Sequence, residues 1–443
     1  MPQTYADILA DTLAALEQGE TRQAFRILRG IFDYPGLLDR RERWTEALET
    51  FARIAVPIAG EEFADLLRRV AADPDDPFLL YDLGYELIDH GLHGPAATVL
   101  TRAHSLRPGD ERIVTELACA LERDGRSVEA CEVILGEPEL QEQSYLCRYL
   151  LAFNRLMCGD LGETRSLLPR LQEVREVDAV LMTRQIEGMI ERADAVKGVT
   201  PLDRRDLRGW HFVVTGTILL HVSPYGRAEG MNGRYAYTHD SDATCLEGIR
   251  RMQAILAELG LTPPRVFALA ERASSVLADA AGQVLGVAVE PWPTHGSPQP
   301  GLIVAYDLGA LEPPVLQSLR LHDTGQVLWA HASCWTDDQP FAVDCATFLH
   351  QFNASPWDKH LSVDPATGEA RETPAVEGPV ESLSRRVMSA GMMPDALADL
   401  PDLLALVRAA RAVQGEHAAG ILRASGARRR HWSGSPVPSN RFR

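Results

Sequence analysis

Residues 77–110 read PFLLYDLGYELIDHGLHGPAATVLTRAHSLRPGD, and this stretch decides the fold of the first half of the chain. Its leucines and small residues recur at intervals of three and four, which is the period of an amphipathic helix. Asp76 followed by Pro77 marks the start of one helix, Gly91 its end, and Pro108 the end of a second helix. The stretch therefore predicts a pair of antiparallel helices.

The same pattern returns further along the chain at a fixed interval. Gly91, Gly125 and Gly159 are spaced 34 residues apart, and the positions around them also match. The shared positions are the small residues Ala96, Ala130 and Thr164, the preceding leucines Leu83, Leu117 and Leu151, and the hydrophobic residues Leu100, Ile134 and Leu168. A fixed period of this length indicates a helical repeat array, in which small residues let paired helices approach and leucines fill the groove between them.

The first unit resembles the tetratricopeptide repeat family at every signature position except the first aromatic. The matching residues are Leu83, Gly84, Leu87, Gly91, Ala96, Leu100, Ala103 and Pro108. The likeness covers residues 77–171 well, although the third unit departs from it at Arg155 and Pro169, and residues 36–72 do not keep the register. We expect a helical array over residues 1–198.

The resemblance implies a concave groove lined by the first helix of each unit. The groove positions are Phe78, Tyr81, Tyr85 and Ile88, then Arg112, Thr115, Cys119 and Glu122, then Leu146, Tyr149, Phe153 and Leu156. Two of these three rows are aromatic and apolar, which is typical of a partner-binding surface. We expect a protein or peptide partner bound by Phe78, Tyr81, Tyr85, Ile88, Arg112, Tyr149 and Phe153. The alternative is that a segment of the chain itself, or the second domain, fills the groove.

Composition excludes several classes of function. The formal charge of −18 argues against a nucleic-acid partner, because phosphate neutralisation needs a basic surface. The lysines are Lys197 and Lys359, and neither follows a glycine-rich turn, so no Walker loop is present. The seven cysteines contain no C-x-x-C pair. The start of the chain has no signal-peptide profile. The longest apolar run, 212–222, is shorter than the roughly 20 residues of a membrane helix. We therefore expect a cytoplasmic protein without a membrane partner.

A change of hydrophobic period after a linker at 199–208 indicates a second domain over residues 199–361. We expect strands at 210–222, 265–269, 287–292, 302–306 and 327–332, and helices at 244–259, 273–285 and 341–352. Alternating strands and helices favour a mostly parallel sheet covered on both faces. The fold class predicted for the whole chain is α + α/β, with a tetratricopeptide-like array, a compact α/β domain and a helical C-terminal extension.

Ligands of open α/β sheets bind at the carboxyl ends of the strands, so the polar residues of those loops form a possible ligand pocket. They are His239, Asp240, Asp242, Glu271, Asp307, Cys334 and Asp337. Asp240 and Asp242 have a spacing that suits a divalent ion, but aspartate also favours helix N-caps, and we expect the pair to cap the helix that begins near Thr244. No cofactor and no metal is assigned.

Catalytic motifs are absent from the sequence. No G-x-S-x-G, H-E-x-x-H or G-x-G-x-x-G occurs, so no catalytic residue is assigned. Cys334 and His331 could pair as nucleophile and base, but on a continuous strand the two side chains point to opposite faces.

The remaining residues divide into a connector and a tail. Residues 362–380 are rich in Pro, Glu, Thr and Gly and predict a flexible linker. Residues 381–443 predict helices at 382–388 and 397–424, followed by a basic flexible tail that contains Arg428, Arg429 and Arg430.

Three functions of different classes are compatible with these features, and the third of them is a chaperone-like or regulatory partner of a neighbouring gene product. The first is an adaptor whose array binds a partner peptide while the α/β domain presents a second binding surface or a small-ligand pocket. The second is a glycosyl- or phosphoryl-transfer enzyme recruited to protein substrates by its repeats, although the α/β region is short for a transferase with two nucleotide-sugar domains.

Overall fold

The computed structural model describes residues 4–337, 339–363 and 367–440. The chain separates into two compact units, Met1–Thr183 and Arg184–Arg443. The domain boundary expected near residue 198 stays a prediction. Among the described residues, no helix combines the length and the apolar character needed to cross a membrane.

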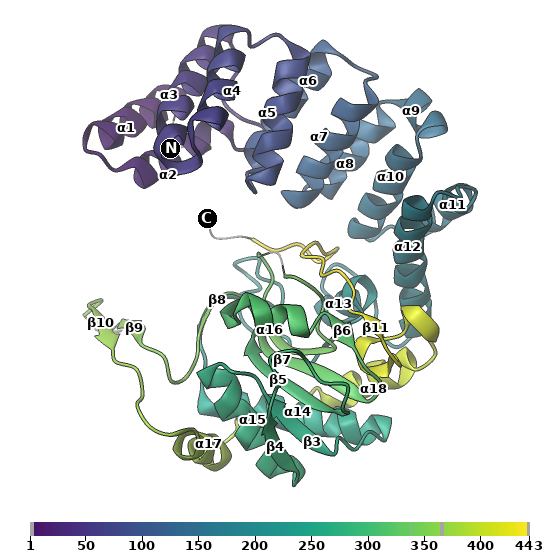
Figure 1. The fold of residues 1–443 in the computed structure, drawn as a ribbon. Helices are drawn as coiled ribbons and strands as arrows, with labels where there is room; N and C mark the ends of the chain where they lie inside the picture. The colour runs from purple at the N-terminus through teal and green to yellow at the C-terminus, as the bar shows by residue number, and fades with distance from the viewer. Residues whose placement is uncertain (1–3, 338, 364–366, 441–443) are drawn as a thin grey trace. The chain divides into compact units, whose positions relative to one another are not determined.

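The first unit is made of helices that follow one another as antiparallel pairs (Figure 1). The pairs are α1 with α2, α3 with α4, α5 with α6, α7 with α8, and α10 with α11. The bounds are α1 Tyr5–Glu17, α2 Thr21–Phe32, α3 Arg41–Ala59, α4 Glu61–Ala72, α5 Pro77–Asp89, α6 His93–Leu106, α7 Glu111–Arg123, α8 Ser127–Leu135, α9 Pro138–Gln143, α10 Tyr145–Met157 and α11 Leu161–Gln172. A long helix, α12 (Val177–Val196), starts in the first unit and continues into the second.

The repeat positions carry the structural roles predicted for them. Gly91, Gly125 and Gly159 follow the first helix of their pairs at φ 72°, 79° and 84°, a left-handed conformation that favours glycine. Ala96, which is completely buried, lies where α6 crosses α5. A Cβ atom added at Gly84 would lie 2.5 Å from Leu100 Cγ, so this crossing requires glycine. These features confirm a tetratricopeptide-like helical region.

An additional helix pair, α3 with α4, occupies the stretch in which the repeat register is lost. Aromatic rings hold it in place: Phe51 lies 5.7 Å from Phe25, 5.5 Å from Phe32 and 5.8 Å from Phe63, measured between ring centroids. Phe63 continues the series to His90 at the end of α5, with 4.8 Å between centroids. The α4 helix therefore packs beside α5.

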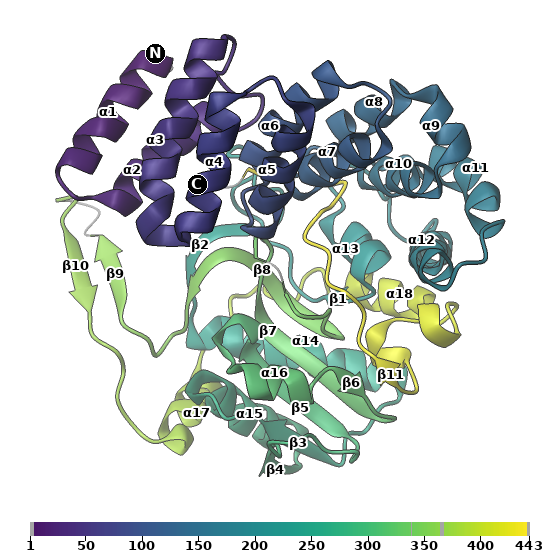
Figure 2. The same cartoon turned by 45° about the horizontal axis from the view of Figure 1, so that its top comes forward.

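The second unit is built on a parallel sheet with the strand order β1-β8-β7-β5-β3-β4, and β2 also pairs with β8 (Figure 2). The strands are β1 Ile218–Leu219, β2 Tyr235–His239, β3 Arg265–Ala268, β4 Ala288–Pro291, β5 Gly301–Asp307, β7 Gln326–Cys334 and β8 Cys345–Ala354. The associated helices are α13 Leu207–Thr215, α14 Asp242–Leu259, α15 Arg272–Leu285, α16 Pro313–Ser318, α17 Val380–Ser389 and α18 Leu400–Ala410. The prediction of a mostly parallel sheet is confirmed.

Two predicted elements of this sheet are wrong. Residues 341–352 were expected to form a helix, but strand β8 occupies most of this stretch, and its residues 345–350 are all buried. A strand covered on both faces has a continuous apolar run, whose period does not distinguish it from a buried helix. The stretch 210–222 was expected to be one strand, but residues 210–215 belong to α13, which Asp206 caps and which ends at Gly216, and the strand β1 is limited to Ile218–Leu219.

A flexible tail was expected at the C-terminal end, but residues around Arg428 pack against the rest of the second unit. Arg428 Nη1 lies 2.8 Å from Asp344 Oδ1, and the two side chains are 2% and 3% exposed. Short strands at β11 (Gly426–Ala427) and β6 (Leu321–His322) pair beside them. The expected linker 362–380 includes the second strand of a hairpin, β9 (His360–Val363) with β10 (Ala370–Thr373). Residues 441–443 lie outside the described part of the chain.

Candidate functional site

The predicted groove residues fall into an exposed and a buried set. Phe78 and Tyr85 on α5 are 42% and 45% exposed, Tyr81 between them is half-buried, and Arg112 on α7 is exposed. Ile88, Tyr149 and Phe153 are only 6%, 5% and 2% exposed. The prediction that these last three line an open groove is therefore wrong.

The burial on α10 has a packing explanation. This helix contacts α7, α8, α9 and α11, so most of its surface faces neighbouring helices. Tyr149 and Phe153 lie one helical turn apart and stack, with 6.2 Å between ring centroids. Both rings belong to the core of the unit rather than to a free surface.

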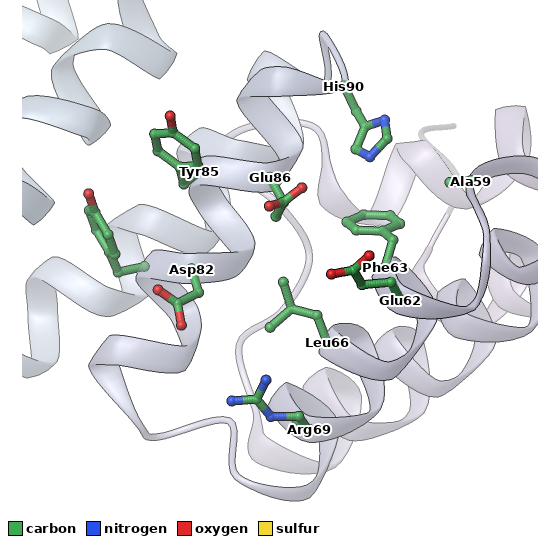
Figure 3. Close-up of a pocket in the computed structure, with 10 residues that line it drawn as sticks. Ala59, Glu62, Phe63, Leu66, Arg69, Asp82, Tyr85, Glu86 and His90 are labelled. Atoms are coloured by element: carbon green, nitrogen blue, oxygen red, sulfur yellow. The ribbon is translucent and has the colours of Figure 1, made fainter.

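A hollow of about 590 Å³ lies where α4 and α5 face each other (Figure 3). It combines aromatic rings with charged side chains. The residues that line it are Ala59, Glu62, Phe63, Leu66, Arg69, Tyr81, Asp82, Tyr85, Glu86 and His90. Tyr81 and Tyr85 are the two predicted groove residues that contribute to it. The α4 residues were missed because the sequence loses the repeat register in residues 36–72.

Arginine side chains already lie over the aromatic rings next to this hollow. The guanidinium carbon of Arg107 is 4.8 Å from the centroid of the Phe78 ring, and that of Arg112 is 5.5 Å from the centroid of Tyr81. Burial raises the pKa of the Tyr81 phenol, and the nearby Glu116 raises it further, so the ring is neutral over the physiological range. Neutral rings with cations at this distance are the geometry of cation–π contacts.

In the second unit, the predicted ligand residue Asp240 is 5% exposed and lies in the core. Its Oδ2 atom accepts hydrogen bonds from Tyr306 Oη at 2.7 Å, from His331 Nε2 at 3.0 Å and from Cys245 Sγ at 3.4 Å. Burial opposes ionisation of Asp240, but the charge and hydrogen bond of His331, together with the Tyr306 hydroxyl, hold the pKa of this carboxyl below its usual value. Asp240 is the hub of a buried polar network.

Asp240, Cys245 and His331 also present an oxygen, a sulfur and a nitrogen within 4.8 Å of one another. Such donors could hold a zinc-like ion. Without such an ion, His331 and Cys245 already donate hydrogen bonds to the Asp240 carboxylate, so these polar groups have partners. The network therefore has a structural explanation that needs no bound group.

Asp240 and Asp242 were expected to cap α14, but the residue between them is the cap. Ser241 is the N-cap, and its hydroxyl oxygen accepts from the backbone N–H of Thr244 at 3.1 Å. Asp242 is the first residue of the helix and accepts from Trp357 Nε1 at 3.1 Å and from Arg386 Nη2 at 2.8 Å. The two carboxylates have separate partners, so they do not form a shared divalent-ion site.

The other predicted ligand residues do not meet in one pocket. Glu271 caps α15 through the backbone N–H groups of Ala273 and Ser274, both at 2.7 Å. His239 stacks on His360, and Asp337 accepts from the hydroxyl of Thr336. These side chains have local structural roles.

Asp307 and Cys334 share one neighbour, His350, which the sequence did not single out. His350 Nε2 donates to Asp307 Oδ2 at 2.9 Å, and His350 is the register partner of Cys334 across β7 and β8. Burial raises the pKa of the Cys334 thiol, which disfavours a reactive thiolate. His331, the base considered for Cys334, belongs to the Asp240 network, as expected for opposite faces of one strand.

Comparisons with known proteins identify no family. No family model matches the chain, and no curated protein matches it. Among solved structures, MamA AMB-1 aligns with a TM-score of 0.25 and 18% identity over 40% of this chain and 96% of that one. A point mutant of MamA aligns with a TM-score of 0.23 and 16% identity over 41% of this chain and 96% of that one. At these scores the likeness carries no argument about function.

Proposed function

We propose that the first unit is a tetratricopeptide-type array that binds a peptide segment of a partner protein, and that the chain is an adaptor. The observation that carries this proposal is the exposure of Phe78 and Tyr85 on one helix beside the hollow between α4 and α5. Apolar rings next to a concavity are typical of protein-binding surfaces. The second unit is proposed to present a further binding surface.

The transferase alternative would draw support from a divalent-ion site, but Asp240 and Asp242, whose spacing suits such an ion, have separate partners. Asp240 is committed to His331 and Tyr306, and Asp242 to Trp357 and Arg386. No observation in the described residues favours transfer chemistry over binding.

The test is a selection of random peptides on the whole 443-residue chain, followed by fluorescence anisotropy with the enriched peptides. We expect Tyr85→Ala to weaken binding at least about tenfold, as truncation of a central aromatic side chain does at interfaces. Tyr85→Phe should retain most of the affinity, because the ring remains. The matched control is Tyr225→Ala, which removes a ring that is 73% exposed in the other unit.

Thermal unfolding of each variant separates lost binding from lost folding. Since Tyr85 is half-exposed, its replacement should change stability by less than about 1 kcal/mol. The proposal is wrong if no peptide is enriched, or if Tyr85→Ala and Tyr225→Ala affect binding equally.

A further inference from the structure

The hollow between α4 and α5 has an unusual mixture of charge and aromatic surface. Its wall carries the carboxylates of Glu62, Asp82 and Glu86 together with the rings of Phe63, Tyr81 and Tyr85. Figure 3 shows the Glu86 carboxylate lying between Tyr85 and Phe63. From these features, and resting on the proposed function, we infer that the hollow binds a basic side chain of the partner peptide, with arginine preferred to lysine.

The three carboxylates are not neutralised by the array. Within the described residues, none of them has an ion pair or a hydrogen bond, whereas other acidic side chains of the unit, such as Asp75 and Glu142, are paired with arginines. Among the residues that the structure describes, Arg69 is the one arginine that lines the hollow, and Leu66 lies between it and the carboxylates of Glu62 and Glu86 in Figure 3. The hollow is therefore left with a net negative charge.

Helix geometry makes this clustering unfavourable in the free protein. Asp82 and Glu86 are four residues apart on α5, so they lie next to each other on one face of the helix. Like charges at this spacing destabilise a helix. A bound cation would relieve this repulsion.

The rings provide the second recognition element. Tyr81 and Tyr85 have the same four-residue spacing as the carboxylates and adjoin them along α5. A guanidinium group is planar, stacks on rings and donates hydrogen bonds to two carboxylates at once, which an ammonium group does less well. The guanidinium groups of Arg107 and Arg112 already lie over the rings of Phe78 and Tyr81, so the rings of this helix accept guanidinium groups.

Acidic or phosphorylated peptides are disfavoured by the same charges. A phosphate recognition site needs arginine clusters or free helix N-termini facing the ligand, and this wall presents carboxylates instead. The occupant predicted from charge complementarity is a short peptide with an exposed arginine.

The experiment uses the whole 443-residue chain and two kinds of probe. The first probe is each selected peptide, compared with the same peptide in which arginine is replaced by citrulline, an uncharged analogue of similar shape. The second probe is acetyl-arginine methylamide, compared with acetyl-citrulline methylamide by saturation-transfer NMR. We expect citrulline to weaken binding about tenfold or more, from the loss of ion pairs and cation–π contacts together.

Protein variants test the wall directly. Asp82→Asn and Glu86→Gln keep side-chain size and remove charge, and each should weaken arginine binding about threefold while leaving citrulline binding unchanged. Glu139→Gln, which neutralises an exposed carboxylate on α9, is the matched control and should have no effect. Raising sodium chloride to 0.5 M should weaken binding of arginine but not of citrulline, because exposed charges are screened.

The outcomes separate this inference from the proposed function. Enriched peptides without arginine or lysine, or peptides that bind equally well with citrulline, would overturn the inference while leaving the peptide-binding function intact. Acetyl-arginine methylamide binding that depends on Asp82 and Glu86, without any enriched peptide, would support the pocket and contradict the proposed function. Binding that is unchanged in both charge variants would refute the inference.

Discussion

The buried ion pair between Arg428 and Asp344 gives the sharpest prediction about the second unit. Both side chains are almost fully buried, and Arg428 Nε also donates to the carbonyl oxygen of Leu319 at 2.9 Å. Arg428→Met keeps the bulk of the side chain but leaves the Asp344 carboxylate buried without its main counter-charge. Breaking a buried pair in this way costs about 3–5 kcal/mol. That is a large part of the roughly 5–15 kcal/mol by which a domain is stable.

Urea unfolding followed by tryptophan fluorescence measures this loss. Six of the seven tryptophans lie in the second unit, so the signal reports mainly on its unfolding. Adding Asp344→Asn to Arg428→Met removes the unpaired charge, so the double variant should be more stable than Arg428→Met alone. Arg430→Met is the matched control, because Arg430 is exposed and packs on the Trp432 ring at 4.1 Å.

A loss below about 1 kcal/mol in Arg428→Met, or a loss equal to that of Arg430→Met, would refute the reasoning. Either result would mean that the C-terminal residues do not pack on the sheet and that the tail is flexible, as the sequence suggested.

Three further predictions concern the cores of the two units and the independent folding of the first. Asp240→Asn should destabilise the second unit by about 3 kcal/mol, because the donors on Tyr306 and His331 lose a charged acceptor. The pKa of Asp240 is lowered in the folded state, so its contribution to stability is complete above the unfolded pKa near 4 and is lost as the pH falls. Between pH 5 and pH 3, the urea midpoint of Asp240→Asn should therefore fall less than that of the unmodified protein. An equal fall in both proteins would contradict the role of this carboxylate. Ala130→Arg places a charge at a completely buried position of α8 and should lower the free energy of unfolding by about 3 kcal/mol or more. Val128→Arg, at a position on the same helix that is 56% exposed, should leave stability nearly unchanged. Equal shifts of the thermal unfolding midpoint would show that the crossing of α7 and α8 is not tight. A fragment of residues 1–198 should be folded and strongly helical by circular dichroism, because repeats contact mainly their neighbours, and an unfolded fragment would contradict an autonomous array.

The sequence predicted the helical array through features that are local along the chain. The period of the leucines, the glycine at each turn and the 34-residue repeat act within one or two helices, so they can be read from one segment at a time. The 34-residue period did not predict the α3–α4 pair, because contacts of Phe51 with Phe25, Phe32 and Phe63 replace the leucine pattern there.

The candidate site was predicted only in part, for a related reason. Phe78, Tyr81, Tyr85 and Arg112 lie at or near the surface, as expected for the groove, whereas Tyr149 and Phe153 occupy equivalent repeat positions and are buried. Position within a repeat specifies which face of the helix a residue occupies, but not whether a neighbour covers that face. The carboxylates of α4 and α5 come together only because the two helices pack side by side.

The sequence by itself therefore determined the class of each unit: a helical repeat array, followed by a mostly parallel α/β sheet. Tertiary structure decided which groove rings are free, that residues 345–354 form a strand, and which polar groups are paired. Asp240 meets His331 across 91 residues of sequence, and Asp344 meets Arg428 across 84. Helical period is a property of neighbouring residues, whereas burial and the pairing of buried charges depend on segments that become neighbours only when the chain folds.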